Sequence, residues 1–91
     1  MRCFALCLIL LLPACVGGVA SRTVVQGTGG ELLKLRAGPG LGYNVILGLP
    51  DETQLVRRNC VMESMQTWCR VSLADAPSIT GYVAEDYLAE R

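Results

Sequence analysis

Residues 54–73 read QLVRRNCVMESMQTWCRVSL, and their second half alternates between apolar and polar positions. This period of two is typical of a β-strand with one buried face. Cys69, Val71 and Leu73 therefore share one face, which we expect to be the core. Trp68 falls on the other face, together with Arg70 and Ser72, and that face is expected to point outward.

The same stretch predicts a hairpin, because a second apolar run precedes the alternating one. If Cys60 lies opposite Cys69, Val61 faces Trp68 and the tip falls at 63–66. Met62 and Met65 then lie in the loop at 61–66. They give it an adaptable apolar surface, or they fold back over the end of the core.

Outward from this hairpin, short β-rich runs alternate with Gly, Pro, Asp, Asn and Ser every eight to twelve positions. No long run has the three-and-four spacing of a helix. Six strands are predicted, at 23–26, 31–35, 45–49, 54–60, 67–73 and 79–83, followed by one 3₁₀ turn within 84–88. Five or six short strands in about seventy residues are too few for two deep sheets. The fold class is therefore all-β, a small, strongly bent, partly open barrel.

Glycine is expected to serve two local purposes. Gly38, Gly40 and Gly42 suit a tight loop that needs positive φ, and Gly81 suits a close approach between strands.

The first twenty residues form a separate segment, of which sixteen are apolar. Arg2 and the nine apolar residues of 4–12 are typical of a secretory signal, because a membrane-spanning helix needs about 20 apolar residues. Cleavage after Ala20 is one expectation. The other rests on the string LPAC at 12–15, which resembles the bacterial lipobox, so that lipidation of Cys15 would make an outer-membrane lipoprotein. Either way the chain is expected in the periplasm or cell envelope.

Only two of the five cysteines, Cys60 and Cys69, lie beyond this leader. An even pair in a small exported domain indicates a disulfide. The alternatives are two free thiols or part of a metal site, although two thiolates without histidine fall short of the four ligands of structural zinc.

Charge and composition exclude several functions. Eight basic residues balance eight acidic ones, so no basic excess favours nucleic acid. The chain contains no histidine, the commonest general base and metal ligand. Glu85 and Asp86 are adjacent acids, but we expect them to be solvated turn residues rather than a glycosidase pair. No enzyme activity, cofactor or metal is expected.

Several motifs in order point to a known family. They are LKLRAGPG at 33–40, YNVI at 43–46, WCRV at 68–71, GYV at 81–83 and YL at 87–88. In this order and spacing, residues 23–89 resemble the bacterial SH3-like (SH3b) domain. The resemblance implies a small SH3-like barrel that acts as a non-catalytic binding or targeting module of the envelope. Its implied ligand is peptidoglycan or its peptide stems. The alternatives are a protein-interaction adaptor, or a secreted inhibitor that presents the loop at 61–66 to an envelope protein.

The resemblance also implies candidate ligand-binding residues. Trp68 and Tyr87 match two positions of the aromatic groove that binds extended peptides in eukaryotic relatives of this fold, while Ala84 replaces the groove proline. Trp68 is either an exposed binding residue or a partly buried packing residue. Tyr43 is a further binding candidate, although packing is its more ordinary role. Arg36 can hold loop carbonyls or an acidic partner.

Overall fold

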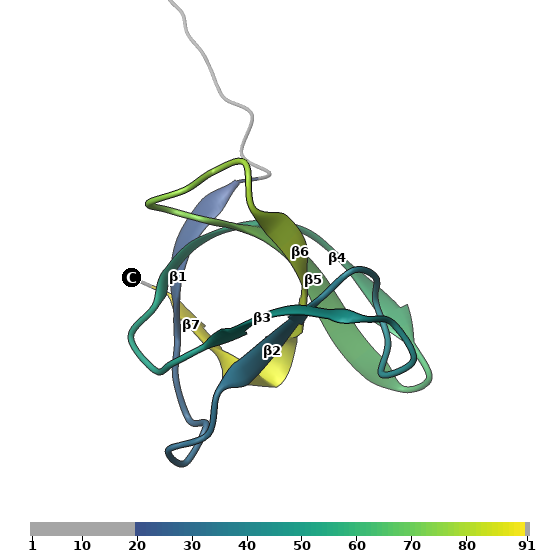
Figure 1. The fold of residues 1–91 in the computed structure, drawn as a ribbon. Helices are drawn as coiled ribbons and strands as arrows, with labels where there is room; N and C mark the ends of the chain where they lie inside the picture. Colours follow the sequence, from purple (N-terminus) through teal and green to yellow (C-terminus); the bar gives the residue numbers. More distant parts are fainter. Residues whose placement is uncertain (1–19, 91) are drawn as a thin grey trace, which may run out of the picture.

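Seven antiparallel strands form one curled sheet in the computed structural model, which describes residues 20–90 (Figure 1). The strand order is β3-β2-β6-β5-β4-β1-β7, and the sheet does not close because β3 and β7 remain its edges. The elements are β1 (Ser21–Val25), β2 (Leu33–Arg36), β3 (Val45–Leu49), β4 (Gln54–Glu63), β5 (Gln66–Leu73), β6 (Thr80–Ala84), the 3₁₀ turn η2 (Glu85–Tyr87) and β7 (Leu88–Glu90). The predicted all-β class is confirmed.

The structure has one more strand than the sequence predicts. The expected 3₁₀ turn is present but ends at Tyr87, and β7 follows it and pairs with β1. Thr23, at the centre of β1, is buried and donates its hydroxyl hydrogen to the carbonyl of Ala89 at 2.8 Å. The pairing of β7 with β1 also satisfies backbone groups of β1 that would otherwise lack partners.

The core lies inside the curl. Its fully buried side chains come from strands spread along the whole sheet, and they are Val25, Leu35, Leu49, Leu55, Cys69, Val71 and Val83. In β5, Cys69 and Val71 face this core and Leu73 packs at its margin, as the alternation predicts. Because no strand contributes more than two such residues and β7 contributes none, the core is small and close packing matters at every position.

The outward-facing prediction for β5 is wrong at two of its three positions. Trp68 is only 5% exposed and Ser72 is fully buried, whereas Arg70 is exposed. Trp68 pairs with Ala84 at the end of β6, and the turn η2 begins directly after Ala84 and contacts β5. A strand face that is later covered by another segment keeps the same period of two, so alternation alone cannot distinguish it from a solvated face.

The β4–β5 hairpin has the predicted register. Cys60 lies opposite Cys69, Val61 opposite Trp68 and Glu63 opposite Gln66, and a disulfide joins the two cysteines. The strands extend further than expected, so the predicted loop at 61–66 shrinks to a two-residue turn.

The two residues of that turn, Ser64 and Met65, have φ of 51° and 66°. Two residues of positive φ match the twist of the flanking strands.

Glycine plays a different role in the loop after β2 than the sequence suggests. Gly38, Gly40 and Gly42 do not have positive φ. Instead, the ring of Tyr43 lies against Gly38 and Gly40, and a side chain at Gly38 would collide with it. The expectation for Gly81 is confirmed, since a Cβ there would lie 2.7 Å from the carbonyl oxygen of Arg36.

The leader prediction at 1–20 and the lipidation candidate Cys15 lie outside the described residues, apart from Ala20 itself. Both cleavage alternatives leave the sheet intact, because β1 begins at Ser21. Across residues 20–90 there is no helix with the length and apolar character needed to cross a membrane.

Candidate binding groove

A groove of about 260 Å³ runs along the outer surface between β2 and η2. Its floor and walls include Leu33, Lys34, Arg36, Trp68, Ala84 and Tyr87. Glu31 and Leu32 line it ahead of β2, and Leu41 lines it from the loop between β2 and β3. The lining thus combines apolar and aromatic side chains with a few charged groups, the composition usual for ligand sites.

Two segments far apart in the sequence bring the aromatic residues together. Trp68 stands near the start of β5 and pairs with Ala84 at the end of β6. The single turn of η2 then carries Tyr87 to the same groove, and the backbone N–H of Gln26 donates to the Tyr87 carbonyl at 2.8 Å. Tyr87 is 38% exposed, so its ring is available to a ligand, whereas the buried Trp68 forms a fixed part of the lining.

Arg36 holds one wall of the groove in place. Its Nη1 donates to the carbonyls of Leu41 and Tyr43 at 3.1 and 3.0 Å, across the loop that joins β2 to β3. Of the two roles considered for Arg36, binding loop carbonyls is therefore the one observed. The same side chain still lines the groove, so its charge contributes to the surface that a ligand meets.

Two further charges lie at the groove on the β2 side. Lys34 is an exposed residue of β2, and Glu31 is exposed two residues before that strand. Neither forms an ion pair within residues 20–90. A groove with both signs of charge can take up a ligand that carries a carboxylate and an amine.

Tyr43 is not part of the groove lining. Its half-exposed ring covers the glycines of the β2–β3 loop, which is a packing role. Sequence reasoning missed three leucines of the lining instead: Leu32, Leu33 and Leu41. Leu41 did offer a signal, because it is a large apolar residue between two glycines of a loop, and it is highly exposed.

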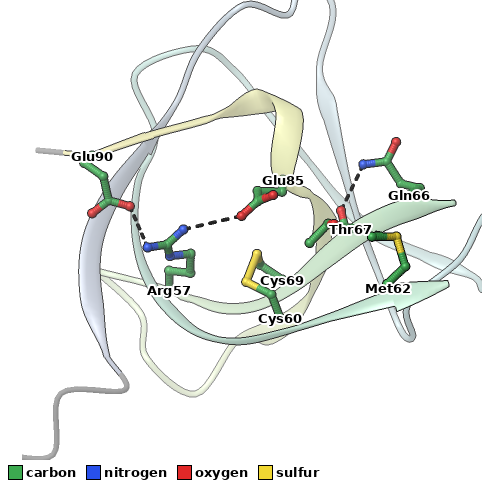
Figure 2. The surroundings of a disulfide bond; sticks show 8 residues. All are labelled: Arg57, Cys60, Met62, Gln66, Thr67, Cys69, Glu85 and Glu90. Carbon is green, nitrogen blue, oxygen red and sulfur yellow. Dashed lines mark hydrogen bonds and ion pairs between the residues drawn. A yellow bond between two sulfur atoms is a disulfide. The ribbon is translucent and has the colours of Figure 1, made fainter.

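A second cluster of charged residues lies beside the disulfide (Figure 2). Arg57 of β4 makes ion pairs with Glu85 of η2 at 3.8 Å and with Glu90 of β7 at 2.8 Å. The turn and the last strand are thereby tied to β4. Glu85 is a partly solvated turn residue, with its side chain 44% exposed, and it also takes part in this cluster.

Glu85 also lies near the two sulfur atoms, with all three candidate ligand atoms within 4.8 Å of one another. Cys60 and Cys69 are joined to each other, so neither offers the thiolate that binds a metal. In its oxidised form this cluster is therefore a structural feature rather than a metal site.

Comparison with known proteins gives no match to this chain, whether with protein-family models, curated proteins or solved structures.

Proposed function

We propose that the protein is a non-catalytic binding module of the bacterial envelope, of SH3b type, whose groove between β2 and η2 receives peptidoglycan or its peptide stems. One observation carries this proposal. Trp68 and Tyr87, which the family resemblance assigns to a groove, line the same groove although they are nineteen positions apart.

The chemistry of the groove suits an extended peptide that bears charged groups. Tyr87 and the apolar side chains provide flat surface, and such surface binds peptides without requiring one sequence. Lys34 and Arg36 offer donors to a carboxylate, and Glu31 offers an acceptor to an amine. Stem peptides of the cell wall carry both kinds of group.

A binding role fits this groove better than hydrolysis does. Glu31 is its only carboxylate among the lining residues, whereas glycoside hydrolysis uses a pair of acids flanking the bond. The chain also lacks histidine, so no imidazole can activate a hydroxyl or thiol nucleophile.

The test is co-sedimentation with purified sacculi, using the oxidised protein exported with its own leader. Tyr87→Ala removes the exposed ring of the groove, and we expect about tenfold weaker binding. Lys34→Glu reverses one groove charge and should also weaken binding. Its loss relative to wild type should grow as the salt concentration is lowered. Met65→Ala is the matched control, because Met65 is 96% exposed at the hairpin tip, outside the groove.

Equal pelleting of all four proteins would show that the groove is not the wall-binding site. Absence of pelleting by the folded wild type would remove peptidoglycan as the ligand and leave a protein partner.

The hairpin tip supports a second candidate, that of an adaptor or secreted inhibitor with a protein target. Met65 and Met62 are 96% and 67% exposed there, on a hairpin braced by the disulfide three residue pairs from the turn. Flexible, polarizable methionine side chains adapt to varied partner surfaces. If this candidate is right, Met65→Ala weakens capture of an envelope protein whereas Tyr87→Ala does not.

A further inference from the structure

Exposed apolar side chains concentrate in one stretch of the chain. Of nine large apolar residues that are exposed, six come from residues 32–47, and they are Leu32, Leu41, Tyr43, Val45, Ile46 and Leu47. Three consecutive members of this group form the first part of β3, where Val45 and Ile46 are about half exposed. Isolated exposed leucines are ordinary, but here three consecutive residues of one strand expose apolar side chains on both of its faces.

β3 is also an edge of the sheet, so one side of its backbone has no strand beside it. Natural edge strands are commonly protected from pairing by charged side chains or proline within the strand. Here residues 43–50 carry no charge, and the single proline, Pro50, stands after the end of β3. The strand therefore combines an edge without a neighbouring strand and apolar side chains with an absence of charge or internal proline, and its one irregularity is the bulge at Ile46.

The opposite edge has that protection. β7 contains only three residues, and its last one, Glu90, is charged and bound to Arg57. Pairing of β3 with β7 of another copy would also repeat without end and build a fibre. Pairing of β3 with β3 closes after two copies, since the β3 edge of each copy is then used and only the protected β7 edges remain.

We propose that two copies of this chain pair through β3, antiparallel about a two-fold axis, and so join their sheets into one. In such a pair residue i faces residue j and residue j faces residue i, so each charge in the strand would occur twice within one short paired edge. The uncharged stretch 43–50 avoids this conflict, and the balanced charge of the whole chain adds no long-range repulsion between copies.

Ile46 is the residue of β3 best placed to test the pairing. The register shifts between Leu35 and Arg36, which pair with Leu47 and Val45, so Ile46 has no opposite residue in β2. Its side chain is half exposed. A lysine at this position therefore disturbs the parent sheet little, yet it places two like charges in the paired edge.

The experiment measures the mass of the exported, oxidised protein by light scattering after size exclusion, over a range of concentrations. We expect wild type to reach twice the mass of the chain, and Ile46→Lys to remain at once that mass. Met65→Lys is the matched control, because it places the same charge at an exposed apolar site away from β3, and it should form the dimer. A wild type that stays monomeric throughout, or an Ile46→Lys variant that dimerises as wild type does, would overturn the proposal.

Hydrogen exchange on the wild type keeps the test decisive if the variant fails to fold. The amides of residues 45–48 that face away from β2 should exchange more slowly as protein concentration rises, and unchanged rates would count against the dimer. Neither experiment includes wall polymer, so a result against the dimer in either one does not count against the proposed binding of peptidoglycan. If both proposals hold, the dimer carries two grooves and binds a repeating polymer with increased avidity.

Discussion

Gly81 lies where β6 passes closest to β2, and replacing it with alanine tests how tightly this junction is packed. A Cβ at Gly81 would lie 2.7 Å from the backbone oxygen of Arg36 and 2.8 Å from Cγ of the fully buried Leu35. Neither atom belongs to a flexible, exposed chain, so β2 must shift outward or β6 must bend. Overpacking of this kind costs about 1–3 kcal/mol.

Part of that cost is offset in the unfolded chain, because alanine has fewer conformations than glycine and this contributes about 0.4–1 kcal/mol of stability. We therefore expect a net loss of about 1–2 kcal/mol for Gly81→Ala. In a domain of this size each kcal/mol lowers Tm by about 4–8 °C, so the melting temperature should fall by roughly 5–15 °C.

The assay is thermal unfolding followed by circular dichroism, with Gly42→Ala as the matched control. A Cβ at Gly42 would meet no other part of the chain within 4 Å, and the backbone there does not need positive φ. That control should be neutral or slightly more stable. If Gly81→Ala melts together with Gly42→Ala, the junction between β2 and β6 is looser than these distances imply, and the packing argument fails.

Three further substitutions probe the hairpin, the core and the last strand. Replacing Cys60 and Cys69 by serine should cost about 2–3 kcal/mol in urea unfolding, since the disulfide closes a short loop, and equal wild-type midpoints with and without a dithiol reductant would contradict this. Trp68→Ala should cost about 3–5 kcal/mol and broaden or abolish the unfolding transition, whereas an outward-facing tryptophan would change stability little. Thr23→Val removes the hydroxyl that binds the Ala89 carbonyl, so a loss of about 1 kcal/mol and faster amide exchange in β7 are expected, and unchanged β7 exchange would argue against this bond as its anchor.

The hairpin could be predicted from sequence because its determinants are local. Alternation in β5 indicated which residues share a face, and placing Cys60 opposite Cys69 gave the observed register. Strand identity and turn position depend on neighbours a few residues apart, which a linear pattern captures well.

Features that depend on distant segments could not be predicted in this way. The surroundings of Trp68 come from distant segments, since β6 pairs with β5 there and η2 brings Tyr87 to the same groove. β7 is only three residues long and shows no useful periodicity, so it is recognisable only once β1 lies beside it. In the β2–β3 loop, the glycine pattern predicts that the backbone needs positive φ. The structure shows instead that the absence of a side chain at Gly38 leaves room for the ring of Tyr43.

The attachment of β2 and β3 to the rest of the sheet links the two surfaces proposed above. This ribbon joins β6 through one register pair, Arg36 with Tyr82, through the close approach of Gly81 to the backbone of β2, and through core side chains such as Leu35. One side of the ribbon forms a wall of the groove, and the other is the free edge of β3. Both proposed surfaces therefore belong to one ribbon, and if a ligand in the groove shifts that ribbon, groove occupancy and association of two copies are linked, each altering the other by the same factor.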